Sequence, residues 1–247
     1  MTSTVLVVPC FNESRRLPVE AFLDFASRRP DTRFLMVDDG SSDGTCAVLD
    51  RMARSSPSFS VLPLEVNVGK GEAVRRGVLK ALEGDAVFIG FFDADLSTPL
   101  EAAASLRAGL ESDPVLEAVF AARVKLAGRV VERGTFRHYA GRVFATLADN
   151  LLRLPFYDSQ CGAKLFRAGP CSQALFEEPF GSRWIFDLEI ALRLKRWGKE
   201  RARGLEELVH EFPLEVWRHH EDSRLTPWDG ARVLVDLVRL WSRYHGV

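Results

Sequence analysis

The sequence contains no long hydrophobic segment, no cysteine-pairing motif and no excess of charge of one sign. None of its 247 residues belongs to an apolar run near the ~18–20 residues that a membrane-spanning helix needs. Cys10, Cys46, Cys161 and Cys171 form neither a C-x-x-C pair nor a zinc-binding spacing, so we expect a reduced, cytoplasmic protein. The net charge of -1 gives no overall basic field that would attract nucleic acid.

Two cofactor motifs are also absent. The first apolar run, Thr4–Val8, leads into Pro9-Cys10-Phe11-Asn12-Glu13 instead of G-x-G-x-x-G, which argues against a dinucleotide-dependent oxidoreductase. The segment Asn67–Gly77 does not match the P-loop motif G-x-x-x-x-G-K-[ST]. Lysine is scarce, so arginine supplies most of the 33 basic side chains. This reflects either the base composition of the genome or the bidentate binding of phosphates by arginine. Because a strand is predicted from Thr4, we expect no signal peptide.

Apolar strand candidates alternate with helix candidates through the first half of the chain. The 47% hydrophobic content is enough for a buried core, and the strand candidates are nearly continuous apolar runs. This alternation predicts an α/β fold with a mostly parallel central sheet and helices on both faces. The predicted strands are Thr4–Val8, Arg33–Val37, Ser60–Leu64, Asp85–Phe92 and Leu116–Ala122. The predicted helices are Leu17–Arg28, Cys46–Ala53, Gly71–Leu82 and Pro99–Leu110.

The second half is more helical and shows neither a repeat nor a linker, so we predict one domain over residues 1–247, with halves at 1–125 and 126–247. Helices are predicted at Arg133–Leu152, Phe186–Trp197 and Pro227–Tyr244, and one or two short strands at Val209–Val216. The last helix combines apolar and arginine side chains. Such a helix either packs on the core with a basic outer face or lies in a membrane interface.

Polar residues gather where the predicted strands of the first half end. In open α/β sheets, ligands bind outside the carboxyl ends of the strands. We therefore expect the loops that follow these strands to meet at one edge of the sheet and form a single site. The loops are Pro9–Arg15, Asp38–Thr45, Asn67–Lys70 and Asp93–Thr98.

The segment Asp93-Ala94-Asp95 is the strongest chemical signal. Residues i and i+2 of an extended chain point the same way, so both carboxylates can face one ion. Carboxylate oxygens suit Mg²⁺ or Mn²⁺, and magnesium often binds through one or two carboxylates together with substrate phosphates. The alternative is that the acids cap the helix before Pro99, but Ser97 or Thr98 can supply that cap.

Two further segments fit a nucleotide ligand. The adjacent acids Asp38 and Asp39 can accept hydrogen bonds from a base or a ribose, although a plain strand–turn–helix connection would also explain the residues around them. Gly69 and Gly71 let the backbone approach an anion at a helix N-terminus. Lys70 either contacts that anion or is simply solvated.

Together these segments resemble the inverting nucleotide-sugar glycosyltransferases of family 2, which have the GT-A fold. The resemblance covers most of the chain and is most specific for the dolichyl-phosphate β-glucosyltransferase branch. Phe11 and Ala163 stand where that branch often has Tyr and Phe, and we expect no counterpart of the membrane anchor of its eukaryotic members. The matching segments are Val8–Glu13, Val37–Thr45, Asn67–Gly77, Asp93–Pro99, Asp158–Phe166 and Phe186–Glu189.

The resemblance implies three groups of functional residues, with Mg²⁺ or Mn²⁺ as the cofactor. Arg123 and Arg137, which belong to the catalytic group below, match two arginines that bind phosphate in related enzymes. The uridine-binding group is Pro9, Phe11, Glu13, Asp38 and Asp39. The group that binds the diphosphate and the metal is Gly69, Lys70, Asp93 and Asp95. The catalytic group is Asp95, Arg123 and Arg137.

The implied reaction moves glucose from UDP-glucose, bound by residues 1–125, to a polyprenyl phosphate bound by residues 126–247. A phosphate monoester, with a second pKa near ~6, can attack without a general base. An alcohol acceptor would need a base, for which Asp158 and Asp187 are the candidates. The alternatives are transfer of mannose from GDP-mannose, a soluble acceptor, or a nucleotide-sugar-binding module without turnover. We expect a cytoplasmic enzyme whose candidate membrane contact is the C-terminal helix, and no nucleic-acid partner.

Overall fold

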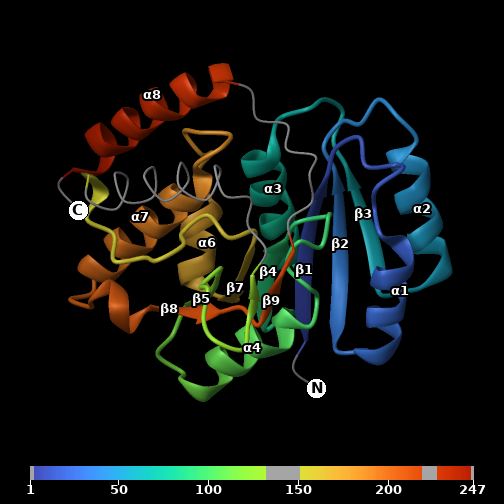
Figure 1. The fold of residues 1–247 in the computed structure, drawn as a ribbon, viewed down its shortest axis with the longest axis horizontal. Helices are drawn as coiled ribbons and strands as arrows, with labels where there is room; N and C mark the ends of the chain where they lie inside the picture. Colours follow the sequence, from blue (N-terminus) through green and yellow to red (C-terminus); the bar gives the residue numbers. More distant parts are fainter. Residues whose placement is uncertain (1–2, 132–150, 219–226, 246–247) are drawn as a thin grey trace.

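The computed structural model describes residues 3–131, 151–218 and 227–245, with the side chains of the last range from 232 onward. Within these residues the central sheet has seven strands in the order β3-β2-β1-β4-β7-β5-β8 (Figure 1). β7 runs antiparallel to β4 and β5, and the other neighbouring strands pair in parallel. The strands are β1 (Thr4–Cys10), β2 (Thr32–Asp38), β3 (Phe59–Pro63), β4 (Phe88–Phe92), β5 (Ala118–Ala122), β7 (Ala163–Arg167) and β8 (Val209–Pro213).

Helices cover both faces of the sheet because successive side chains of each strand point to opposite sides. In β1, Val5 and Val7 belong to one hydrophobic core, while Leu6 and Val8 belong to the other. The helices that pack into the first core are α3 (Lys70–Leu82), α6 (Pro170–Phe176), α7 (Phe186–Lys199) and α8 (Pro227–Tyr244). Those that pack into the second are α1 (Val19–Arg28), α2 (Thr45–Ser55) and α4 (Ala102–Ser112).

The mostly parallel α/β fold predicted from the sequence is confirmed, with two local differences. β7 was not predicted as a strand, because its sequence Ala-Lys-Leu-Phe-Arg is short and places a lysine in the core. α4 begins at Ala102 rather than at Pro99, so neither Ser97 nor Thr98 caps it; a turn precedes the helix instead, in which Ala102 N–H donates to the Pro99 carbonyl.

The short strands expected around Pro213 are β8 and β9 (Val216–Trp217), and β9 pairs with β6 (Val130–Val131) in a separate two-stranded sheet. A 3-10 turn, η1 (Leu205–Glu207), precedes β8. The helix predicted at residues 133–152 lies almost entirely outside the described residues.

The register of the strands places the ends of four of them at one edge. Cys10 lies opposite Asp38 where β1 and β2 end, and Phe92 lies opposite Ala163 where β4 ends and β7 begins. α3 packs closely against β1, which the glycine at position 77 permits, since a Cβ there would overlap the Val7 side chain. The N-terminus of α3 lies beside the ends of β1, β2 and β4, where Lys70 pairs with Asp93 and Gly69 N–H donates to Asp39.

A buried ion pair links β7 to α7 beneath this edge. Lys164 is fully buried, and its Nζ lies 2.5 Å from Asp187 Oδ1 and 2.7 Å from the Cys161 carbonyl oxygen. The ammonium also lies 5.3 Å and 5.1 Å from the ring centroids of Phe91 and Phe120. In such surroundings each charge depends on the other, because an uncompensated buried ion is costly.

We expect Lys164→Met to destabilise the protein by about 3–5 kcal/mol, because it leaves the Asp187 carboxylate buried without its cation. The double variant Lys164→Met/Asp187→Asn should recover a large part of that loss, since neither charge remains. Urea unfolding of both proteins measures the difference. Lys80→Met is the control, because Lys80 pairs with Glu83 and both side chains are exposed to solvent. A double variant no more stable than the single one would contradict this account.

Candidate active site

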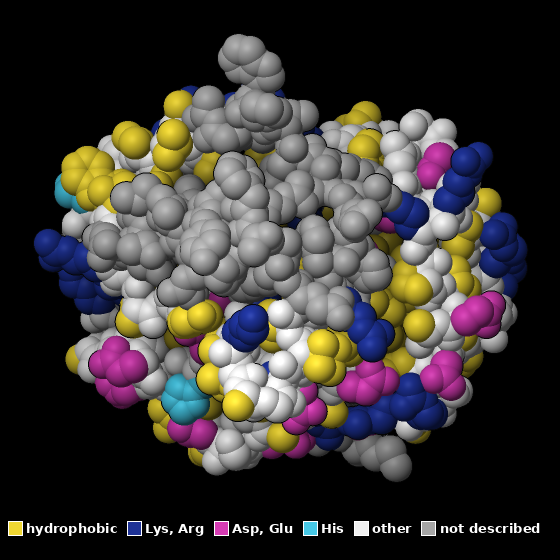
Figure 2. Space-filling model, in the orientation of Figure 1, with side chains coloured by type: hydrophobic (Ala, Val, Ile, Leu, Met, Phe, Trp, Pro, Cys, Tyr) yellow, Lys and Arg dark blue, Asp and Glu magenta, His cyan; other side chains and the backbone are white. Residues whose placement is uncertain are grey.

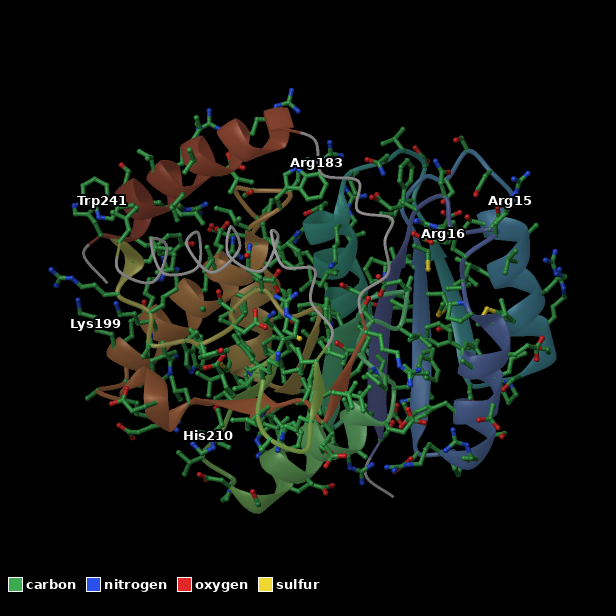
Figure 3. All side chains as sticks on the ribbon, in the orientation of Figure 1. Arg15, Arg16, Arg183, Lys199, His210 and Trp241 are labelled. Atoms are coloured by element: carbon green, nitrogen blue, oxygen red, sulfur yellow. The ribbon has the colours of Figure 1, made fainter. Side chains whose placement is uncertain are left out.

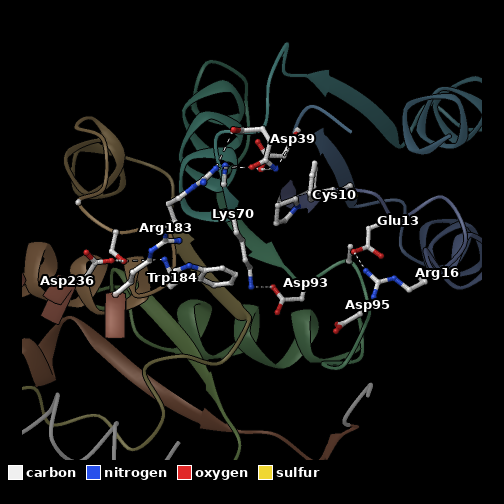
Figure 4. A pocket seen from close by; sticks show the side chains of 18 of the residues that line it. Cys10, Glu13, Arg16, Asp39, Lys70, Asp93, Asp95, Arg183, Trp184 and Asp236 are labelled. Carbon is white, nitrogen blue, oxygen red and sulfur yellow. Dashed lines mark hydrogen bonds and ion pairs between the residues drawn. The ribbon is translucent and has the colours of Figure 1, made fainter. Parts of the chain in front are cut away.

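A cleft of about 1460 Å³ opens at the carboxyl edge of the sheet (Figure 4). Most of the predicted site residues line it, namely Pro9, Phe11, Glu13, Asp39, Gly69, Lys70, Asp93 and Asp95. They come from the ends of β1, β2 and β4 and from the start of α3. Two predicted residues, Asp38 and Arg123, lie at the same edge but not among the lining residues, and Arg137 lies outside the described residues.

Asp39 holds the loop that precedes α3. Its carboxylate accepts hydrogen bonds from the backbone N–H groups of Val68 at 2.8 Å and Gly69 at 2.9 Å, and from the Asn67 side-chain amide at 3.0 Å. Burial raises the pKa of Asp39, while these backbone donors act in the opposite direction. The three bonds give Asp39 a positioning role in the structure, and its predicted contact with the nucleotide stays a prediction.

Arg183 holds the same loop from the other side. Its guanidinium donates to the Asn67 side-chain oxygen at 2.8 Å and to the Val68 carbonyl at 3.2 Å. Gly69 has φ of 96°, and a Cβ there would overlap Arg183 Nε. A residue with a side chain at position 69 would therefore be strained and would also displace Arg183.

The loop after β1 is tied to the loop after β2. Asn12 has φ of 52°, its side-chain oxygen accepts from Ser42 N–H at 2.9 Å, and its own N–H donates to Ser41 Oγ at 3.0 Å. Glu13 N–H donates to Thr45 Oγ1 at 2.7 Å. These bonds fix the backbone between Asn12 and Glu13, so Phe11 and Glu13 are presented to the cleft. Asp38 contributes nearby by accepting from Ser41 N–H at 3.1 Å.

The Asp93 carboxylate lies between Lys70 and Gly162. Its Oδ1 is 2.6 Å from Lys70 Nζ, and its backbone N–H donates to the Gly162 carbonyl at 3.0 Å. A Cβ at Gly162 would overlap the carboxylate, so only glycine leaves room for it. Burial raises the pKa of Asp93, and the charge of Asp95 adds to this effect, whereas Lys70 lowers the pKa.

Asp95 follows two residues later and accepts from Ser97 N–H at 2.9 Å through Oδ1. Within the described part of the chain, no cluster of three or more His, Cys, Asp or Glu side chains could hold a metal by itself. Two neighbouring carboxylates fit a hard cation that keeps water ligands and is completed by phosphate oxygens. Asp93 and Asp95 would hold Mg²⁺ or Mn²⁺ in that way.

Arg123 makes a bidentate ion pair with Asp158 at the end of β5. The two N–O distances are 2.6 Å and 2.7 Å, and the guanidinium lies 5.3 Å from the Trp217 ring centroid. Asp158 is therefore committed to Arg123, and Asp187 is committed to Lys164. Both carboxylates that the sequence offered as bases for an alcohol acceptor have a cationic partner in the structure.

The far wall of the cleft consists of residues that the sequence reasoning missed. They come from the segment before α7 and from α8, and Ser182 joins the two by donating to Asp236 at 2.6 Å. Trp184 is 40% exposed within this wall. Nothing in the spacing of these residues marks them; their nearness to the matched segment Phe186–Glu189 is the one available signal. They are Gly181, Ser182, Arg183, Trp184, Arg232, Val235, Asp236 and Arg239.

Comparison with known proteins gives consistent results. The family model described as Glycosyl transferase family 2 matches residues 5–173. A dolichyl-phosphate beta-glucosyltransferase of Mus musculus is 30% identical over 255 residues, which cover 97% of this chain and 75% of that protein. Dolichyl-phosphate beta-glucosyltransferase ALG5C of Trichomonas vaginalis is 29% identical, and the match covers 96% of this chain and 70% of that protein.

Solved structures resemble the fold. Glucosyl-3-phosphoglycerate synthase from Mycobacterium tuberculosis, in complex with Mn²⁺ and UDP-glucose, superposes with a TM-score of 0.67. The match covers 98% of this chain and 79% of that one at 18% sequence identity. At this identity the likeness establishes the common GT-A fold.

We expect Gly162→Ala to weaken the manganese-dependent binding of UDP by about tenfold or more, or roughly 1.4 kcal/mol, because the new methyl group displaces the Asp93 carboxylate. Calorimetric titration of UDP in the presence of Mn²⁺ measures this. Gly169→Ala is the matched control, since a Cβ at Gly169 meets nothing within 4 Å. Unchanged UDP affinity in a folded Gly162→Ala protein would show that the position of Asp93 is unimportant.

Proposed function

The chain belongs to glycosyl transferase family 2, and on that premise we propose that it transfers glucose from UDP-glucose to a polyprenyl phosphate of the dolichyl type. The observation that carries this proposal is the match to dolichyl-phosphate beta-glucosyltransferases over almost the whole chain. The match to the Mus musculus protein covers 97% of this chain. The cleft, with the neighbouring carboxylates of Asp93 and Asp95 and the N-terminus of α3, offers the chemistry that such a donor requires. The reaction inverts the configuration of the anomeric carbon.

The donor would bind along the ends of β1, β2 and β4. Phe11 and Pro9 offer an apolar surface for the uracil ring, and Glu13 lies beside them to accept hydrogen bonds. The diphosphate would lie at the N-terminus of α3, where Gly69 allows close backbone approach and Lys70 adds positive charge. Asp93 and Asp95 would hold the divalent cation, which supplies Lewis-acid stabilisation of the leaving diphosphate when bound.

The acceptor would attack the sugar from the side of the second half of the chain. A phosphate monoester is mostly ionised at neutral pH and needs orientation rather than deprotonation. The ion pairs of Asp158 and Asp187 support such an acceptor over an alcohol, because neither carboxylate is available as a general base. Arg123, which Asp158 holds in place, would orient the acceptor phosphate together with Arg137.

We propose that α8 gives this enzyme a peripheral contact with the membrane that contains the acceptor. Its inner face packs into the core through Leu237, Leu240 and Tyr244. A second apolar stripe at Leu234, Val238 and Trp241 is 55%, 59% and 43% exposed. Among the described helices, none is long and apolar enough to cross a bilayer.

The surface around this stripe suits an anionic bilayer. Hydrophobic side chains gather at the upper left of the molecule, over α8 (Figure 2), and Trp241 points outward from the helix (Figure 3). Arg239, also on α8, is 73% exposed and lines the cleft as well. A helix with exposed leucine, valine and tryptophan beside arginine is typical of interfacial binding. The same helix would therefore bring the cleft next to the lipid headgroups.

A screen of donors against acceptors tests the function. With Mn²⁺ or Mg²⁺, we expect glucose to pass from UDP-glucose into an organic-extractable polyprenyl product. Asp95→Asn should lower the rate about 10²-fold or more, because the charge that develops on the diphosphate loses its stabilisation. Asp85→Asn is the matched control, since Asp85 is 78% exposed and pairs with Arg33 away from the cleft. Transfer into water-soluble products alone, or from GDP-mannose alone, would overturn the proposal.

The triple variant Leu234→Gln/Val238→Gln/Trp241→Gln tests the membrane contact. We expect it to float with anionic liposomes at least tenfold less than the unaltered protein, because it removes apolar area from the interface. Its rate with a short, water-soluble polyprenyl phosphate should be unchanged. Val87→Gln/Val115→Gln is the control, since both valines are similarly exposed elsewhere, at 42% and 46%. Equal flotation of the triple variant and this control would contradict the assignment.

A further inference from the structure

The Lys70 ammonium lies beside Asp93 Oδ1, where a metal ion bound to that oxygen would lie. Its Nζ lies 2.6 Å from Asp93 Oδ1, and this oxygen is itself buried (Figure 4). Among the described residues, Oδ1 has no hydrogen-bond donor other than this ammonium. The Lys70 side chain, by contrast, is 39% exposed to the cleft. A cation from solvent can therefore reach Oδ1 only after the ammonium has moved.

The same oxygen cannot serve both cations in this arrangement. A Mg²⁺ ion bound to Oδ1 would lie about 2.0–2.1 Å from it, in the space beside the oxygen that the ammonium fills. Two cations on one carboxylate oxygen would also repel each other strongly in a partly buried site. Coordination of a metal by Oδ1, and therefore by both oxygens of the Asp93 carboxylate, thus requires that the Lys70 ion pair break.

The backbone just before Lys70 is held in place, so the Lys70 side chain is the part that can change partner. Gly69 N–H donates to Asp39 at 2.9 Å, and the carbonyl of Val68, the residue before Gly69, accepts from Arg183. Lysine has a flexible four-carbon stem with three rotatable donors. A diphosphate at the N-terminus of α3 would lie within reach of that stem and would offer the ammonium new anionic oxygens.

We propose that Lys70 is an internal competitor of the metal ion: it neutralises Asp93 in the free enzyme and releases it when a diphosphate arrives. The metal and the nucleotide then bind with positive coupling. The diphosphate draws the Lys70 ammonium away from Asp93, and a metal at Asp93 leaves that ammonium free to contact the diphosphate. The free enzyme would bind divalent cations weakly, and UDP would increase that affinity. This inference rests on the proposed function only in assigning a diphosphate and a divalent cation to the cleft.

Manganese binding without turnover tests the proposal. Free Mn²⁺ is followed by electron paramagnetic resonance as protein is added, first alone and then with UDP. Lys70→Met should bind Mn²⁺ at least tenfold more tightly than the unaltered protein in the absence of UDP. UDP should then increase the manganese affinity of this variant by a smaller factor than it does in the unaltered protein.

Three further variants make the result specific. Lys80→Met changes another lysine of α3, which pairs with the exposed Glu83, and should behave as the unaltered protein does. Lys70→Arg keeps a cation at the position and should bind Mn²⁺ weakly without UDP. Lys70→Met/Asp93→Asn should lose the tightened binding, which locates the ion at Asp93.

The proposal is overturned if folded Lys70→Met, with an unchanged unfolding temperature, binds Mn²⁺ no more tightly than the unaltered protein without UDP. An equal gain in Lys80→Met would overturn it as well, because the effect would then be one of net charge. The titration uses neither sugar nor acceptor. Failure to transfer glucose to a lipid phosphate would therefore leave this inference standing, and failure of the titration would leave the transfer assay unaffected.

Discussion

A partly buried carboxylate at the end of a central strand requires a cation, and the site of this protein is arranged around that requirement. Asp93 reaches its position because Gly162 of the segment before β7 leaves room for it, and Lys70 supplies the charge from the start of α3. Asp39, the residue that follows β2, in turn holds the backbone of Gly69 directly before Lys70. One ion pair thus depends on three strands and one helix being correctly placed.

Many of the polar residues that mark the family position other residues. Asp39 and Asn12 use their side chains to hold the loops that present Gly69 and Phe11, and Asp158 holds Arg123. The buried pair of Lys164 and Asp187 joins β7 to α7 beneath the cleft. A site for a highly charged ligand needs such support, because its loops carry backbone groups and charges that must stay in fixed geometry when the ligand is absent.

The sequence was most informative where pattern and chemistry are local. Alternating apolar strands and helices predicted the parallel part of the sheet, and the polar segments after β1, β2 and β4 do line one cleft. It was least informative about β7, a short strand with a buried lysine, and about the wall formed by Arg183, Trp184 and α8. Those contacts join segments that are distant in the chain: Ser182 and Asp236 are 54 residues apart, and Arg183 and Asn67 are 116 apart. No periodicity or motif spacing encodes a contact of that kind.

The sequence by itself determined the fold class, the family and which loops meet at the sheet edge, because strand periodicity and the polar segments at strand ends are local properties of the chain. Only the tertiary structure decided what each polar side chain does there. It pairs Asp158 with Arg123, Asp187 with Lys164, and Lys70 with Asp93. It also leaves one stripe of α8 exposed while the other packs on the core. The reason is physical: the partner and burial of a charge depend on segments that are distant in sequence, and these come together only in the folded chain.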